Sequence, residues 1–301
     1  MGHLVVDITD LSRWFGRKAA LDRVSFRAAE GRVYGLVGAN GAGKTTLIRH
    51  LLGLLRARSG SVRVFGLDPS RDPVEVLGRV GYLSEERELP EWMRVEELMR
   101  YTQAFHPGWD MAYARELLDT FALDPARKIH ELSRGMRAQA GLVAAVAHRP
   151  ELLVLDEPSS GLDAVVRRDI LDAIVRTVVD DGRTVIFSSH LLDEVERMSD
   201  HVTMIHQGRV AVDGALDEVR REYRRSRVQF VEPFDRLPAV AGALSLEGSG
   251  RTWSVVHDGS EEGFRRSVAQ LGGEIVESRN ATLEEIFLAR VGRTGQNVEA
   301  A

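Results

Sequence analysis

The chain of 301 residues contains no cysteine, only three lysines and no long hydrophobic run. The lack of cysteine excludes disulfides, thiolate zinc sites and cysteine nucleophiles, and it fits a reducing compartment. The longest apolar runs, such as residues 142–147, fall far short of the ~18 residues that a membrane-spanning helix needs. No secretory leader is recognisable. We therefore expect a soluble chain.

The bulk composition predicts a folded protein with one large α/β domain and a smaller one. Hydrophobic residues make up 44% of the chain, which is ordinary for a protein with a packed core. The net charge of −5 and the pI near 6.0 argue against a protein that coats nucleic acid nonspecifically. No nucleic-acid partner is expected.

Residues 38–46, GANGAGKTT, match the G-x-x-x-x-G-K-[ST] pattern of a phosphate-binding loop. Lys44 is one of the three lysines among forty basic residues, and a planar guanidinium does not easily replace a compact ammonium beside phosphates. An apolar strand at 32–37 and an apolar-faced helix at 45–55 flank the loop. Strand, loop and helix in this order predict bound ATP or GTP with Mg²⁺. The predicted contacts are Gly38, Asn40, Gly41, Ala42, Gly43, Lys44, Thr45 and Thr46.

Two adjacent carboxylates follow a buried strand. LLVLDEP, residues 152–158, is a continuous apolar run of the kind that a parallel sheet buries on both faces. Asp156 ends this strand, where doubly wound sheets bind ligands, and is a candidate Mg²⁺ partner. Successive side chains along a strand point in opposite directions, so Asp156 and Glu157 can reach different targets, one the metal and the other the attacking water. Glu157 is therefore predicted to be the general base that activates water. The alternative is an Asp-Glu pair that only ends the strand.

His190 follows the next predicted strand, 184–187, and is expected at the same sheet edge. There an imidazole can bind the γ-phosphate and orient the attacking water. A histidine with a structural role is the alternative.

A second anion site is predicted at LSRGM, residues 132–136. Ser133 and Gly135 lie at the expected start of a helix, where free backbone N–H groups attract anions. Because the phosphate loop already covers one face of a nucleotide, this second site predicts that a partner subunit covers the other face. A homodimer would satisfy both sites.

Further elements are expected on both sides of these motifs. Helical periodicity occupies 95–122, broken at Pro107 and Gly108, and a core-facing helix occupies 165–179. Beyond Leu216 we expect a separate small α/β unit, whose basic run, 220–227, is attributed to solvated arginines ending a helix rather than to lipid contacts. The remaining predictions are strands at 5–8, 24–28, 61–65, 228–231 and 252–256, helices at 261–271 and 283–291, a capping box of Thr282 and Glu285, and a frayed end over the last ten residues.

The ordered motifs resemble the nucleotide-binding subunit of an ABC transporter over about residues 4–214. GANGAGKT corresponds to the family's Walker A motif, LSRGM to its LSGGQ signature, LLVLDEP to Walker B, SSGLD at 159–163 to the D-loop, and His190 to the switch histidine. The resemblance implies the P-loop NTPase ABC-ATPase fold: a RecA-like parallel sheet, an antiparallel β edge subdomain and a helical subdomain. The implied domains are the ATP-binding domain, 1–215, with its helical subdomain at about 85–148, a small C-terminal α/β domain, 216–292, and a tail, 293–301.

The resemblance also implies an activity. The chain would hydrolyse ATP as a head-to-tail homodimer or heterodimer, and would drive export through a separate transmembrane permease subunit at the cytoplasmic face of the membrane. Phe15 would stack on adenine, and Thr45, Glu85 and Asp156 would hold Mg²⁺. Glu157 and His190 would be catalytic, Ser133 and Gly135 would contact the γ-phosphate held by the other protomer, and Asp163 would couple the two sites.

Three positions depart from the family pattern. Phe15 replaces a usual tyrosine, which preserves an aromatic face, although a core phenylalanine is the alternative. Glu85 occupies the position of the Q-loop glutamine, as in exporter-type members, and adds negative charge near phosphate; an acidic solvated loop is the alternative. Arg134 and Met136 replace signature residues. A second hypothesis follows: a soluble ABC-type ATPase or an ATP-gated interaction module with slow hydrolysis and no transport role.

Overall fold

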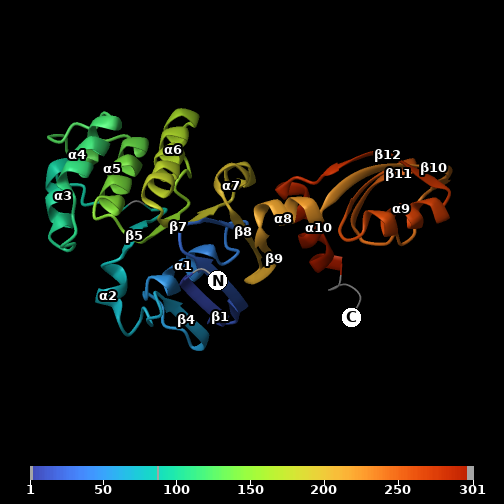
Figure 1. Cartoon of the computed structure of the whole chain (residues 1–301), viewed down its shortest axis with the longest axis horizontal. Helices are drawn as coiled ribbons and strands as arrows, with labels where there is room; N and C mark the ends of the chain where they lie inside the picture. The colour runs from blue at the N-terminus through green and yellow to red at the C-terminus, as the bar shows by residue number, and fades with distance from the viewer. Residues whose placement is uncertain (1–2, 87, 297–301) are drawn as a thin grey trace. The chain divides into compact units, whose positions relative to one another are not determined.

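The computed structural model of the chain describes residues 3–86 and 88–296. The chain divides after Val210 into two compact units, called unit 1 and unit 2 below (Figure 1). The division falls inside strand β9 (Arg209–Ala215), whereas the sequence places the domain boundary at the end of that strand.

The central sheet has the strand order β5-β6-β7-β3-β8-β9 (Figure 1). Neighbouring strands from β5 to β8 pair in parallel, and every residue of β3, β6 and β7 is buried. Burial on both faces explains why these strands are continuous apolar runs in the sequence. Besides β9, the strands are β3 (Val33–Val37), β5 (Val80–Leu83), β6 (Leu152–Asp156), β7 (Thr184–Ser189) and β8 (His201–His206).

Four helices belong to this α/β core, and the first begins at Lys44, directly after the phosphate loop. The predicted helix over 45–55 ends early, because Gly53 adopts a left-handed φ of +70° and its Cα lies too close to the Pro69 carbonyl to carry a side chain. The helices are α1 (Lys44–Leu51), α2 (Pro73–Leu77), α6 (Ala164–Asp181) and α7 (Leu192–Met198).

A second, antiparallel sheet has the order β2-β1-β4. Its apolar residues share one hydrophobic cluster with α1 and the central sheet, as Ile8, Leu47 and Val154 illustrate. The strands are β1 (Leu4–Phe15), β2 (Lys18–Ala29) and β4 (Ser59–Val64), all at positions where the sequence predicts shorter strands.

The helical part of unit 1 has its own core. Leu98, Met99, Leu118 and Val143 are buried together there. Helices α3 (Val95–Gln103) and α4 (Met111–Thr120) are separated by the segment that contains Pro107 and Gly108, as predicted, and α5 (Arg134–Val146) follows a 3₁₀ turn.

Unit 2 is an antiparallel sheet, ordered β11-β10-β12, with helices. The predicted capping box is confirmed: the Glu285 N–H donates to Thr282 Oγ1 at 3.2 Å, and the Thr282 N–H donates to Glu285 Oε2 at 2.9 Å. Its elements are α8 (Leu216–Glu222), β10 (Arg224–Phe234), β11 (Ala243–His257), α9 (Glu261–Gln270), β12 (Gly273–Asn280) and α10 (Leu283–Gln296).

Two predictions for unit 2 are wrong in part. Only Arg220 and Arg221 end a helix; from Arg224 the basic run forms β10, because Ser226 and Val228 are buried on one face of the sheet. The prediction of a frayed end over the last ten residues is also wrong for 292–296, since α10 continues to Gln296 and Gly292 does not adopt the left-handed φ that ends many helices. Residues 297–301 lie outside the described part of the chain.

Candidate functional site

Three adjacent parallel strands end at one edge of the central sheet and place the predicted site there. Val37 pairs with Ser189, and Asp156 pairs with Ser188. The phosphate loop, Glu157 and His190 each follow the end of one of these strands directly. Parallel pairing therefore brings the phosphate loop to Glu157 and His190, which lie more than a hundred residues later in the sequence.

Close packing leaves room only for glycine at two positions of the phosphate loop, Gly38 and Gly43. A side chain at Gly38 would overlap the Ile205 carbonyl oxygen, and a Cβ at Gly43 would lie 2.5 Å from the Ala20 carbonyl oxygen. Gly43 also has a φ of +120°, which favours glycine. The loop is thus held by close packing of Gly38 and Gly43 against neighbouring backbone. By contrast, nothing lies within 4 Å of a Cβ placed on Gly41, which faces open space.

Lys44, Glu157 and His190 form a continuous polar row. The Lys44 ammonium donates to the Gly38 carbonyl at 2.6 Å and lies 3.0 Å from Glu157 Oε1. The other carboxylate oxygen, Oε2, lies 2.7 Å from His190 Nδ1. An ionised carboxylate only accepts hydrogen bonds, so His190 carries its proton on Nδ1. Lys44 and Glu157 are buried, whereas the His190 side chain is 40% exposed.

Glu157 is held in a backbone conformation that is unusual for its residue type. Its φ is +49°, in the left-handed region. The Glu157 N–H donates to Ser188 Oγ at 2.9 Å, and Ser188 Oγ donates to Asp156 Oδ1 at 2.6 Å. Ser188 thus holds both carboxylate residues. Ser188 was not among the predicted site residues, although it lies only two residues before His190.

A third buried carboxylate, Glu194, was also not predicted. Its Oε2 accepts from Ser159 Oγ at 2.7 Å and from Ser189 Oγ at 2.9 Å, and its Oε1 lies 3.6 Å from Arg167 Nε. These contacts fix the start of the SSGLD segment against β7. Nothing in the spacing of Glu194 distinguishes it from an ordinary helix residue.

A cavity of about 450 Å³ opens beside the phosphate loop. Phe15 lines it, is 49% exposed and lies under the Arg13 guanidinium, 4.9 Å from the ring centroid, so the alternative of a core phenylalanine is excluded. Gly38 and Ala42 support the loop without lining the cavity. The other lining residues are Lys18, Ala20, Asn40, Gly41, Gly43, Lys44, Thr45, Thr46, Glu85 and Glu157, of which Lys18 and Ala20 were not predicted.

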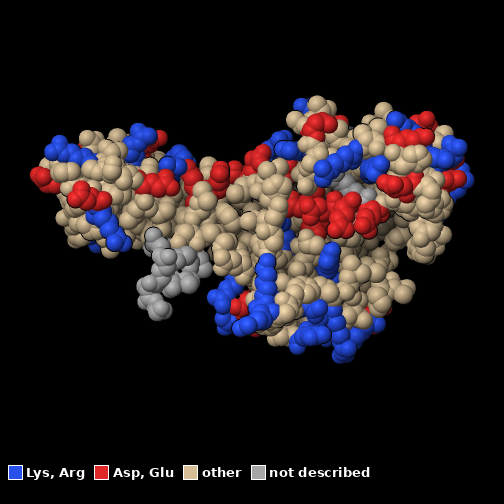
Figure 2. All heavy atoms as spheres, turned by 180° about the vertical axis from the view of Figure 1, so that it is seen from behind, with Lys and Arg blue, Asp and Glu red and all other residues tan. Residues whose placement is uncertain are grey.

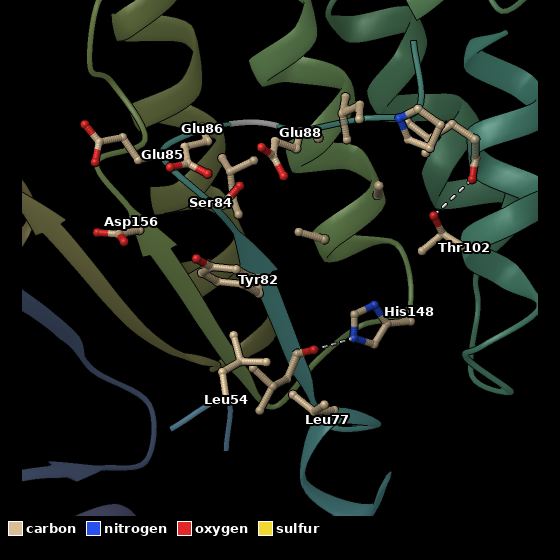
Figure 3. A pocket seen from close by; sticks show the side chains of 18 of the residues that line it. Leu54, Leu77, Tyr82, Ser84, Glu85, Glu86, Glu88, Thr102, His148 and Asp156 are labelled. Atoms are coloured by element: carbon tan, nitrogen blue, oxygen red, sulfur yellow. Dashed lines mark hydrogen bonds between the residues drawn. The ribbon is translucent and has the colours of Figure 1, made fainter. Parts of the chain in front are cut away.

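The predicted metal ligands Thr45, Glu85 and Asp156 line a neighbouring cavity of about 610 Å³. Figure 3 shows the two carboxylates in this cavity. Burial, and secondly the Asp156 charge, raise the pKa of Tyr82 in this cavity to about 12. Among the described residues, no group of three or more His, Asp or Glu side chains is arranged to hold a metal alone. One hydroxyl and two carboxylates fit Mg²⁺, which takes few protein ligands and completes its shell with phosphates and water.

Ser133, Gly135 and Asp163 lie at two helix starts and do not line the 450 Å³ cavity. Ser133 Oγ accepts from the Met136 N–H at 3.2 Å and caps α5, so the predicted helix start is confirmed. Asp163 Oδ1 caps α6 by accepting from the N–H groups of Val165 and Val166, both at 3.0 Å. The structure therefore does not bring these residues to the phosphate loop of their own chain.

Sequence comparison relates the chain to transporter subunits. A family model described as ABC transporter matches residues 21–160. The daunorubicin resistance ATP-binding protein DrrA3 of Streptomyces coeruleorubidus is 35% identical, with 100% of each chain covered. The daunorubicin/doxorubicin resistance protein DrrA of Streptomyces peucetius is 32% identical over 95% of this chain and 92% of its own. The bacitracin transport protein BcrA of Bacillus licheniformis is 31% identical over 73% of each chain.

Solved structures share the fold. The ATP-binding subunit of an ABC transporter matches with a TM-score of 0.66 and 30% identity, covering 72% of this chain and 92% of that one. A dimeric ATP-binding cassette bound to ADP and phosphate matches with a TM-score of 0.63 and 20% identity, covering 70% of this chain and 98% of that one. The predicted fold class is confirmed. Among the described residues, none of the helices has the length and apolarity needed to cross a membrane.

Proposed function

The chain belongs to the ABC transporter family as an ATP-binding subunit, and on that premise we propose how its residues drive export through a separate membrane subunit. ATP binds at the phosphate loop and is hydrolysed there. The observation that carries the assignment of roles is the polar row of Lys44, Glu157 and His190 at the edge of the nucleotide cavity. Phe15 supplies an exposed aromatic face for adenine.

Glu157 acts as the general base for water. It is buried, it lies within reach of the phosphate loop, and its partner Lys44 is the cation that nucleotide phosphates attract. A γ-phosphate that pairs with Lys44 releases one oxygen of Glu157 to accept a proton from water. His190 orients the other oxygen and presents the rest of its half-exposed ring to the phosphate.

Thr45, Glu85 and Asp156 are the residues that would hold Mg²⁺ with the nucleotide. When bound, this ion neutralises charge on the β- and γ-phosphates. Ser188 keeps the Asp156 carboxylate aligned by donating to Oδ1, which leaves Oδ2 for other ligands. Glu85 contributes a carboxylate where an amide is usual, and this adds charge beside the phosphates.

The functional form is a head-to-tail homodimer. The chain carries both halves of a nucleotide site, namely the phosphate loop and the Ser133 cap of α5, but they do not meet within one copy. Two identical copies would complete two identical sites. Asp163, at the start of α6, would lie in the interface and couple them.

The permease docks at the 610 Å³ cavity, which places the chain at the cytoplasmic face of the membrane. The cavity has apolar walls, including Leu54 and Leu77, and an acidic rim of Glu85, Glu86 and Glu88 (Figure 3). Acidic side chains also gather in one patch on the face of unit 1 seen in Figure 2. A partner segment with an apolar face and a basic residue would fit. Thr45 and Asp156 also line this cavity, so docking of the permease would change the surroundings of the residues that hold Mg²⁺ and the nucleotide.

Co-purification with the permease tests this assignment. Tyr101 lines the cavity and is 50% exposed, so Tyr101→Glu should abolish co-purification and leave the basal ATPase rate unchanged. Trp92→Glu is the matched control, since Trp92 is 71% exposed and does not line this cavity. Normal co-purification of the Tyr101 variant would exclude this docking site.

A second candidate function is an ATP-gated interaction module with slow hydrolysis. The observation that favours it is Glu85, a carboxylate that lines both the nucleotide cavity and its neighbour. The steady-state rate of hydrolysis, with and without the membrane subunit, separates the two functions. Stimulation by the membrane subunit supports transport, and a slow rate that does not respond supports the module.

A further inference from the structure

The starts of α5 and α6 interlock through two glycines. A Cβ at Gly135, on α5, would lie 2.8 Å from Cγ1 of Val166, on α6. A Cβ at Gly161, just before α6, would overlap the guanidinium of Arg134, with Nη2 2.7 Å away. Each segment therefore uses a glycine to receive a side chain of the other. An extra methyl group at Gly135 would collide with the short, branched Val166 side chain, and one at Gly161 would displace the Arg134 guanidinium.

Arg134 is not explained by the stability of its own helix. It occupies the first turn of α5, where the helix dipole disfavours a positive charge. Within residues 3–86 and 88–296, no carboxylate forms an ion pair with it, and its guanidinium lies against the backbone of Gly161 instead. Gly161 has a φ of +67°, which favours glycine, and because glycine has no Cβ the guanidinium can pack directly against its Cα.

We infer that Arg134 is a positioning residue that locks residues 159–163 to the start of α5, so that both move as one body. This inference rests on the proposed function, in which both segments face the nucleotide of the other copy. Residues 159–163 are then fixed at three points: Ser159 by Glu194, Gly161 by Arg134, and Asp163 by its cap on α6. Only the middle point depends on Arg134.

Steady-state kinetics of Arg134→Gly test the role. The variant retains the phosphate loop, so the Kd for ATP, measured by calorimetry, should stay unchanged. The kcat should fall by on the order of tenfold, because small displacements of positioned groups slow catalysis strongly. An unchanged kcat would overturn the inference, and so would a loss confined to ATP affinity.

A double-mutant cycle with Gly161→Ala tests the contact itself. Gly161→Ala should lower kcat more in the natural chain than in the Arg134→Gly background, because the overlapping guanidinium is then absent while the strain of the left-handed φ remains in both. Gly66→Ala is the matched control: Gly66 also has a left-handed φ, +80°, but nothing lies within 4 Å of an added Cβ. Equal effects of Gly161→Ala in both backgrounds would contradict the interlock.

Hydrogen exchange separates this inference from the proposed function. In the absence of nucleotide, Arg134→Gly should speed amide exchange in residues 159–166 of the monomer and leave the phosphate loop unchanged. Unaltered exchange there would overturn the interlock even if ATP-driven dimerisation occurs. Faster exchange together with a failure to dimerise would retain the interlock and reject the dimer.

Discussion

The carboxylate of Glu157 lies 3.0 Å from the Lys44 ammonium, and both side chains are buried at the edge of the central sheet. A buried charge needs a partner, so each residue stabilises the charged state of the other. The nucleotide's phosphates attract the same ammonium. ATP binding and the release of Glu157 for catalysis are therefore linked through one lysine.

Lys44→Ala should abolish ATP binding in calorimetry. Among the described residues, Lys44 is the only buried cation that lines the nucleotide cavity, and the variant removes it. It should also lower the free energy of unfolding by roughly 3 kcal/mol, since Glu157 is left buried without its cation. Adding Glu157→Gln should recover part of this stability but none of the binding. Lys128→Ala is the control, because Lys128 is exposed and lies outside this cavity. Retained ATP binding by Lys44→Ala would contradict the assignment.

Glu85→Gln should raise the kcat of ATP hydrolysis up to about fivefold, as expected from removing about 1 kcal/mol of unfavourable charge interaction at an exposed position. Steady-state assays at several Mg²⁺ concentrations give the rate. Glu86→Gln makes the same change of charge outside the nucleotide cavity and should have little effect. A slower Glu85→Gln enzyme would contradict this prediction and indicate that the Mg²⁺ ligand at this position must be charged.

Stability should fall in mild acid because of His148. Burial, and secondly the neighbouring His106, lower the pKa of His148 to about 4, and the two rings stack with centroids 3.8 Å apart. In the unfolded chain His148 binds a proton near pH 6.5, whereas in the folded chain it stays neutral down to about pH 4. The contribution of neutral His148 to the free energy of unfolding is therefore fully present above pH 6.5 and is lost as the pH falls toward 4. The loss is at most about 3 kcal/mol. Urea unfolding at pH 7 and pH 5 should show a smaller difference for His148→Gln than for the natural chain; an equal difference would exclude His148 as its source.

Much of the site is encoded locally and was predictable. The phosphate loop, Asp156, Glu157 and His190 follow apolar runs, and parallel strands bring such positions to one edge of a sheet. The same argument does not identify Ser188 or Glu194. Their roles depend on hydrogen bonds to Asp156 and Ser159, more than thirty residues away, and no sequence spacing predicts these bonds. The left-handed backbone of Glu157 is equally invisible, since glycine is the usual residue there.

The errors in unit 2 have a related cause. The basic run looks like a solvated helix end when charge alone is counted. However, Ser226, Val228 and Phe230 recur with period two and are buried in a sheet. Tertiary pairing of β10 with both β11 and β12 decides the conformation. Local charge patterns carry no information about such partners.

The central claim is that ATP joins two copies of the chain, each supplying the half-site that the other lacks. The most direct test is the molar mass of Glu157→Gln, measured by light scattering at saturating Mg²⁺-ATP, where blocked hydrolysis should trap the closed state. We predict twice the monomer mass of 33.4 kDa with ATP and the monomer mass with ADP. A monomer at full ATP occupancy would contradict the account.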